Sequence, residues 1–370
     1  MTKLSVVPAI LAAVFIAASS PGARAELTPG TPAPDFAGGR TWLNSPPLSL
    51  EKELKGKVVL VDFWEYTCIN CIRTLPALKR IYSRYKPYGF EIVGVHAPEF
   101  DFAYKPENVA MGTKRQRIPW PVVVDSDFSI WRAYDSNSWP NKFLIDARGI
   151  ISRQHAGEGG YAELERWIRD EIKKANPKAV FPASWTIPAD TDDFNPVRCG
   201  PMSEETYVGT ARGSRWGGEI ANREGFQPGK VVLYSSMPRQ VRRGFFAHGL
   251  WKNNADDFEH ARATTEPKDY IGIRYRGNEV YVVMNLKRGQ SARVYVTRDG
   301  KPVPAPRRGV DVAADARGRT YIDLREGRMY YAIQGEDRGT HDLRLSPTGP
   351  GVAINSFTFG NRCLTKFDRL

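Results

Sequence analysis

Two cysteines separated by two residues, Cys68 and Cys71, are the side chains of this 370-residue sequence best suited to chemistry. The apolar run at 57–64 predicts a buried strand before them, and helical spacing of apolar residues predicts a helix over 71–85. A helix start offers unpaired backbone N–H groups and the positive end of the helix dipole, which both stabilise a thiolate. We therefore expect a lowered pKa for Cys68 and thiol–disulfide exchange, with Cys71 resolving the mixed disulfide.

Zinc binding is the main alternative for this pair, because two cysteines at this spacing also supply half of a metal site. The site would then need a second pair of ligands at suitable spacing. Cys199 and Cys363 are single and distant, and the five histidines are scattered along the chain. We therefore favour exchange chemistry, and we expect no metal and no cofactor besides the redox-active pair itself.

Three further features accompany the two cysteines. Asp62 lies inside the apolar strand, where burial would raise its pKa and let it accept a proton from Cys71; an acid paired elsewhere is the alternative. Pro76 follows Cys71 by five residues and would kink the helix. Pro140, preceded by Trp139, comes directly before a predicted strand, and a cis proline there could face the dithiol.

Strands and helices alternate in the first half of the chain, which predicts an α/β layered fold over 26–175. A proline-punctuated segment at 176–200 predicts a linker. Short β-rich runs separated by glycine-containing turns then predict an all-β sandwich or jelly roll over 201–370. The elements expected in the first half are strands at 57–64, 91–95, 122–124, 142–145 and 150–155, and helices at 71–85, 106–116 and 161–174.

The first 25 residues have the pattern of a signal peptide: Lys3, an apolar core over 6–18, and the small residues Ala23 and Ala25. We expect cleavage before Glu26 and a periplasmic or other extracytoplasmic location, where disulfides persist. An uncleaved anchor is the alternative.

Cys199 and Cys363 lie near the two ends of the predicted β domain. The first and last strands of a sandwich are often neighbours, so we expect these residues to form a structural disulfide. Two free buried thiols, or a bridge between chains, are the alternatives.

The formal net charge of +12 is spread over both halves of the chain, so we expect no nucleic-acid site. A local basic cluster at 239–243 is interpreted as a solvated face. A group of aromatic residues in the β domain would form a sugar- or partner-binding face if exposed, although burial in the core is the commoner outcome. These residues are Trp216, Phe245, Phe246, Trp251 and Tyr275.

Residues 63–76, Phe-Trp-Glu-Tyr-Thr-Cys-Ile-Asn-Cys-Ile-Arg-Thr-Leu-Pro, resemble the active-site segment of the thioredoxin superfamily. The likeness is to exported TlpA/ResA-type oxidoreductases and to the extracytoplasmic portion of DipZ-type proteins. It extends over roughly 30 to 175 through residues 32–36, 94–100, 139–146 and 157–159. Residues 205–209 and 356–360 resemble the β-rich, carbohydrate-binding-like module of the DipZ type.

This resemblance implies a thioredoxin-like fold in which Cys68 is the nucleophile, Cys71 the resolving thiol and Asp62 the proton acceptor. Trp139 and Pro140 would shape the surface that binds partner cysteines. The implied partners are protein thiols and disulfides, with a carbohydrate as an additional ligand of the β domain. DipZ-type chains carry a membrane electron-transfer domain where this sequence has a predicted signal peptide, so any reducing partner would be a separate membrane protein.

The sequence allows more than one role for two further residues, and it allows two functions other than thiol–disulfide exchange. Glu65 would either influence the thiolate or face solvent, and His96 is interpreted as structural. A peroxiredoxin-like peroxidase is disfavoured because Thr67 adjoins Cys68 directly, and a binding protein with a thioredoxin-like scaffold is disfavoured because both cysteines are intact. Whether exchange reduces, oxidises or isomerises depends on the redox potential of the pair.

Overall fold

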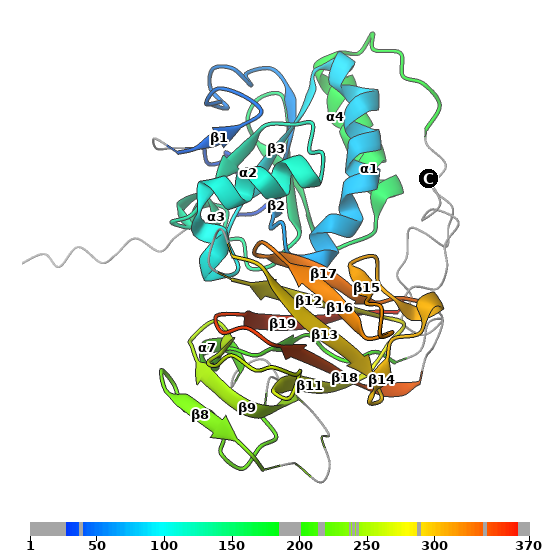
Figure 1. Cartoon of the computed structure of the whole chain (residues 1–370). Helices are drawn as coiled ribbons and strands as arrows, with labels where there is room; N and C mark the ends of the chain where they lie inside the picture. The colour runs from blue at the N-terminus through cyan, green and yellow to red at the C-terminus, as the bar shows by residue number, and fades with distance from the viewer. Residues whose placement is uncertain are drawn as a thin grey trace, which may run out of the picture.

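The computed structural model describes residues 27–36, 40–184, 201–213, 219–236, 238, 241, 244–286, 290–335 and 339–361. Figure 1 shows an α/β region followed by an all-β region. Within the described ranges, no helix has both the length and the apolar character needed to cross a membrane. The predicted signal peptide, residues 185–200 of the predicted linker, Cys199 and Cys363 all lie outside the described residues.

A six-stranded sheet forms the centre of the α/β region, with the strand order β1-β4-β3-β2-β5-β6. Strands β2, β3 and β4 run parallel, whereas β1, β5 and β6 are antiparallel to their neighbours. Every residue of β2 and β3 is buried, as expected for a sheet covered on both faces. The bounds are β1 Trp42–Leu43, β2 Val58–Trp64, β3 Phe90–His96, β4 Val122–Val124, β5 Asn141–Ile145 and β6 Ile151–Ala156.

Helices pack on both faces of this sheet. On one face, α1 and α4 contribute Leu78 and Ile168 to a core that contains Leu60 of β2, and the two helices lie side by side in Figure 1. The opposite face packs against α3 and the chain before β2. Because side chains alternate along a strand, Asp62 points to the same face as Leu60, toward α1. The bounds are α1 Ile69–Tyr85, α2 Pro106–Arg115, α3 Ser129–Ala133 and α4 Tyr161–Ala175.

The all-β region consists of antiparallel strands in two groups that the long strand β9 joins. One group is β10-β19-β12-β17, with β7 and β8 alongside, and the other is β11-β18-β13-β16-β15, with β14. Side chains of both groups, such as Val282 and Ile273, meet in one buried core, as in a sandwich.

The bounds of the elements in this region are β7 Thr206–Tyr207, α7 Thr210–Gly213, β8 Val231–Tyr234, β9 Phe245–Asn253, β10 Phe258–His260, β11 Tyr270–Arg276, β12 Glu279–Asn285, β13 Ala292–Arg298, β14 Lys301–Pro302, β15 Val312–Ala314, β16 Thr320–Leu324, β17 Arg328–Ile333, β18 Thr340–Pro347 and β19 Ala353–Gly360.

The predicted fold class is confirmed, but the sequence pattern did not reveal β9, the strand that joins the two groups. Its sequence, Phe-Phe-Ala-His-Gly-Leu-Trp-Lys-Asn, has no β-branched residue and contains Gly249 at φ +93°. The aromatic residues considered for a binding face are core where the structure describes them: Phe245, Phe246, Trp251 and Tyr275 are all buried. Trp216 and residues 239, 242 and 243 lie outside the described residues.

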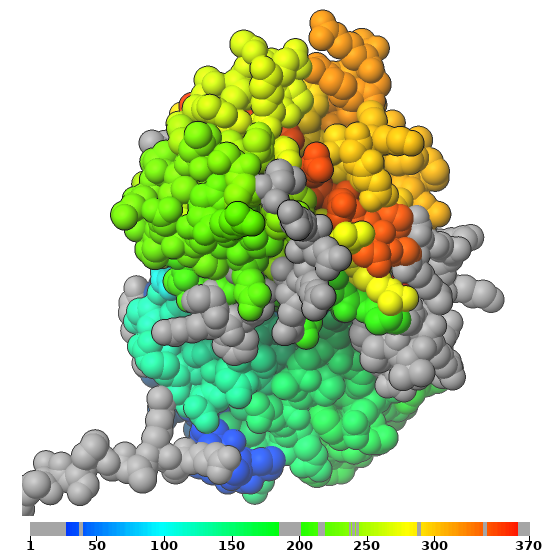
Figure 2. Space-filling view, turned by 90° about the horizontal axis from the view of Figure 1, so that it is seen from below, coloured from blue at the N-terminus to red at the C-terminus, as the bar shows by residue number. Residues whose placement is uncertain are grey.

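The α/β and all-β regions are in direct contact, and the space-filling view shows them as two lobes pressed together (Figure 2). An apolar cluster crosses the boundary, with Ile69 and Phe100 from the α/β region and Tyr281, Val283 and Met329 from the β region. Because Ile69 directly follows Cys68, the β region covers the end of α1 at which the cysteines lie (Figure 1).

Candidate active site

Cys68 is the N-cap residue of α1, and Cys71 lies in the first turn of that helix. The backbone N–H of Cys71 donates to Cys68 Sγ at 3.2 Å, and the backbone N–H of Ile72 donates to the Cys68 carbonyl at 3.0 Å. Cys71 is only 1% exposed, whereas Cys68 is partly exposed. The predicted placement at a strand-to-helix junction is confirmed, and Cys68 is the more exposed of the two cysteines.

The predicted lowering of the Cys68 pKa is wrong. Burial raises the pKa of Cys68 well above its usual range, and neighbouring Cys71 and the charge of Glu99 add to the rise. The Cys71 backbone N–H opposes the rise, as a helix start should, but desolvation outweighs it. Burial also raises the pKa of Cys71. The site therefore disfavours both thiolates.

Asp62 is buried in β2 and faces Lys142, its register partner on β5. Burial raises the pKa of Asp62 to about 6, while the charge of Lys142 lowers it. Burial lowers the pKa of Lys142, against the opposing effects of Asp62 and Cys71. Lys142 Nζ donates to the carbonyl of Gly157 at 3.0 Å. A carboxyl with a pKa of about 6 thus lies close enough to Cys71 for its charge to raise the pKa of that thiol.

Glu65 is fully buried rather than facing solvent. Its carboxylate accepts hydrogen bonds from the Thr67 backbone N–H at 2.6 Å and from the Thr67 hydroxyl, and lies 3.5 Å from His96 Nε2. His96 is buried and stacks on the ring of Tyr66, with ring centroids 5.4 Å apart. Through these contacts both residues stabilise the turn that leads from β2 to Cys68, which supports the structural interpretation of His96.

Pro140 follows a cis peptide bond, as the sequence predicted, and directly precedes β5. The next residue, Asn141, pairs with Phe63 near the end of β2, so Pro140 lies level with the turn that carries Cys68. Trp139 is partly buried, and its Nε1 donates to the carbonyl of Ala97 at 3.1 Å. The structure thus brings the two residues expected to bind partners to the same end of the sheet as the dithiol.

Arg73 links the cysteine-bearing helix to the β region. Its guanidinium lies 3.5 Å from Glu279 Oε2 and 3.3 Å from the Tyr281 hydroxyl, and also 3.6 Å from Glu158. Its Cζ lies 5.3 Å from the centre of the Tyr281 ring. This buried contact anchors the β region to α1 only two residues beyond Cys71.

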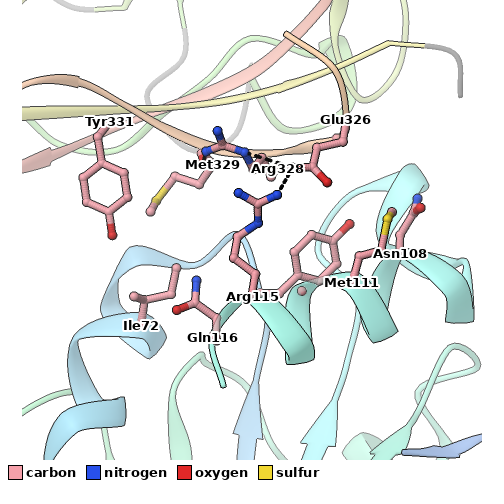
Figure 3. A pocket seen from close by; sticks show the side chains of 12 residues that line it. Ile72, Asn108, Met111, Arg115, Gln116, Glu326, Arg328, Met329 and Tyr331 are labelled. Carbon is pink, nitrogen blue, oxygen red and sulfur yellow. Dashed lines mark hydrogen bonds and ion pairs between the residues drawn. The ribbon is translucent and has the colours of Figure 1, made fainter. Parts of the chain in front are cut away.

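A cavity of about 40 Å³ remains between α1, α2 and the β16–β17 turn. In Figure 3, Ile72 and Arg115 point toward the β region, while Met329 and Tyr331 point back from β17. Arg115 forms an ion pair with Glu326 across the gap. The cavity has room for one or two water molecules but not for a peptide, and Cys68 does not line it.

Sequence reasoning missed Lys142 and Glu99 as members of the site, and also Arg73. Lys142 begins the otherwise apolar run Lys-Phe-Leu-Ile, two residues after Pro140. A lysine in such a run indicates a buried charge, and a buried charge needs a partner. The contacts that Glu99 and Arg73 make with the β region join residues more than 100 positions apart, which sequence spacing does not reveal.

Two family matches cover most of the described chain. Residues 29–154 match the AhpC/TSA family, and residues 203–360 match a family described as thioredoxin like C-terminal domain. The first match contains both cysteines, Asp62 and Pro140, and the second contains the β region.

The protein DipZ of Mycobacterium tuberculosis is 32% identical over 334 residues, which is 89% of this chain and 43% of DipZ. The chain therefore spans less than half of that relative. The thiol-disulfide oxidoreductase ResA of Bacillus cereus is 31% identical over 118 residues, or 32% of this chain and 65% of ResA. A solved thiol:disulfide interchange protein from Chlorobium tepidum is 27% identical, with 39% of this chain and 98% of that chain covered at a TM-score of 0.34.

Proposed function

Because the α/β region belongs to the thioredoxin superfamily, we propose that the chain is an exported thiol–disulfide oxidoreductase that acts on protein disulfides. One observation carries this proposal: the partly exposed Cys68 caps α1 and lies beside the buried Cys71, whose thiol is within reach of the charge of Asp62. A nucleophilic sulfur, a resolving sulfur and a proton acceptor are the three groups that exchange requires.

Exchange proceeds in two displacements. The Cys68 thiolate attacks one sulfur of a partner disulfide, forms a mixed disulfide and releases the other partner sulfur as a thiolate. Cys71 then loses its proton to Asp62 and attacks Cys68 Sγ. The Cys68–Cys71 disulfide forms, the second partner sulfur leaves as a thiolate, and the partner has gained two electrons from the chain. These two sulfurs carry the electrons, so no other cofactor is needed.

We propose the reducing direction. A strong disulfide oxidant stabilises its reduced form through a low-pKa thiolate. Here burial raises the pKa of both cysteines, which removes that stabilisation and favours donation of electrons to a partner. The spent disulfide must then be reduced again by a second dithiol, for which we propose a separate membrane electron-transfer protein. The predicted signal peptide supports this extracytoplasmic location.

Reduction of insulin by dithiothreitol, followed by turbidity, tests the activity. The wild-type chain should accelerate precipitation of the insulin B chain, and Cys68→Ser should reduce the rate to the uncatalysed level. Ser83→Ala, on the exposed face of α1, is the matched control and should retain full activity. A wild-type rate no faster than dithiothreitol alone would contradict the proposal, as would full activity of Cys68→Ser.

A further inference from the structure

Glu99 lies on the loop after β3, and this loop contacts Trp139 beside the cis proline and Ile69 at the start of α1. At one end, the Ala97 carbonyl accepts the hydrogen bond from Trp139, beside Pro140. At the other end, Phe100 packs in the same buried cluster as Ile69, the residue after Cys68. The loop is therefore seated between the partner-facing proline and the cysteine-bearing helix.

The β region holds the Glu99 side chain in place. Glu99 Oε1 accepts hydrogen bonds from the Tyr207 hydroxyl at 2.6 Å and from Arg212 Nη1 at 2.9 Å. Arg212 Nη2 also donates to the Glu99 backbone carbonyl at 2.6 Å. The Glu99 side chain is only 9% exposed. Two side chains of the β region thus bind a carboxyl of the α/β region through hydrogen bonds.

The charges around Glu99 come from both regions of the chain. Burial, together with the charges of Glu205 and Glu65, raises the pKa of Glu99 to about 8, against the lowering effects of Arg212 and of the hydrogen bond from Tyr207. The charge of Glu99 in turn raises the pKa of Cys68. The titratable and charged groups that face Glu99 are Glu65 and Cys68 from the α/β region and Glu205, Tyr207 and Arg212 from the β region, with Asp256 beyond Arg212.

We propose that Glu99 is a positioning residue for the exchange reaction: its charge opposes ionisation of Cys68, and the hydrogen bonds from Tyr207 and Arg212 let the β region influence that charge. The inference deepens the proposed function, on which it rests. It gives the β region a role in the chemistry itself, because the two residues that bind the Glu99 carboxylate both belong to that region. Glu99 donates no proton and forms no bond in the exchange steps.

The test follows alkylation of Cys68 by iodoacetamide between pH 6 and 11 in the full-length reduced chain, with the modified peptide quantified by mass spectrometry. In the wild type, ionisation of Glu99 and of Cys68 should give two coupled steps. Glu99→Gln should leave one step at lower pH and speed alkylation at pH 8 on the order of 3- to 30-fold, since the opposing charge is gone. Its thiol–disulfide pair should also become more oxidising, because the thiolate is better stabilised.

Tyr207→Phe and Arg212→Gln each remove a donor to the Glu99 carboxylate, so both should move the Glu99 step to higher pH. Arg115→Gln is the matched control: it breaks an ion pair elsewhere at the same interface and should leave the profile unchanged. Identical profiles in the wild type, Glu99→Gln and Tyr207→Phe would overturn the proposal, as would an equal shift in Arg115→Gln. Alkylation needs no catalysis, so these outcomes are separate from failure of the insulin assay.

Discussion

Asp62 and Lys142 are register partners on the neighbouring strands β2 and β5, and each side chain is only 1% exposed. Residues directly opposite each other in an antiparallel pair share one face of the sheet, so both point toward α1. Burial disfavours the charged form of each side chain, whereas the charge of each side chain favours the charged form of the other. The pair therefore contains a carboxyl with a pKa of about 6, whose charge raises the pKa of Cys71.

Asp62→Asn should slow insulin reduction on the order of 100-fold at pH 7 without abolishing it, because Cys71 loses its proton acceptor but both sulfurs remain. The loss should shrink as the pH rises toward the pKa of Cys71, where solvent removes the proton. Initial rates between pH 5 and 10 measure this effect. Equal rates for the variant and the wild type across this range would exclude the role of Asp62.

The same substitution should change how stability depends on pH. The pKa of Asp62 is about 6 in the folded chain against 3.8 as the ordinary value, so ionisation favours the unfolded state. Wild-type stability should therefore fall, relative to Asp62→Asn, as the pH rises from 4 to 7, by on the order of 3 kcal/mol. Urea unfolding of both proteins at pH 4 and pH 7 gives the difference. A difference independent of pH would show that the Asp62 pKa is not raised.

Lys142→Met should move the acidic limb of the activity profile to higher pH, because the charge of Lys142 lowers the pKa of Asp62. Lys142→Arg keeps the charge and serves as the control for the electrostatic effect. The measurement is the pH at half-maximal insulin reduction. If Lys142→Met and the wild type share that pH, the two residues are not coupled.

Gly112→Ala should destabilise the chain, although alanine normally favours a helix interior by about 1 kcal/mol. A Cβ at this position of α2 would lie 2.6 Å from the Tyr66 ring, which stacks on His96 beside the active-site turn. Overpacking of this kind costs about 1–3 kcal/mol. Thermal unfolding of the variant and of the wild type measures the loss. Stabilisation by the single substitution would contradict the close contact.

Much of the fold was predictable because the spacing of apolar residues along the sequence matches the pattern of buried residues in the strands and helices. The strands at 58–64 and 90–96 and the helix at 161–175 all lie within two residues of their predicted bounds. The missed strand β9 lacks the local β pattern and is specified by pairing with β8, β10 and β11. Tertiary pairing, not propensity, decides such a strand.

The candidate site likewise has features that the local sequence predicts and features that depend on tertiary contacts. The two cysteines, Asp62 and Pro140 could be found from types and spacing along the chain. The raised pKa of Cys68 could not, because it depends on desolvation at the site and on the charge of Glu99. A helix start alone predicts the opposite direction.

Cys199 and Cys363 stay a prediction, since both lie outside the described residues. If they form a structural disulfide, it should resist mild reductant that opens Cys68–Cys71, because structural bridges have low potentials. Cys199→Ala should then lower the thermal stability of the β region by a few kcal/mol and leave Cys68 able to exchange. Non-reducing peptide mapping identifies the bridge. Free thiols at both positions would refute it.

Trapping of the mixed disulfide tests the central claim most directly. Cys71→Ser retains the partly exposed Cys68 but cannot resolve the intermediate, so incubation with a disulfide-bonded peptide should leave that peptide attached to Cys68. Peptide mass mapping under non-reducing conditions locates the bond, and Cys68→Ser should trap far less because Cys71 is buried. The account predicts a stable adduct at Cys68 that dithiothreitol releases. No adduct, or an adduct only at another cysteine, would contradict it.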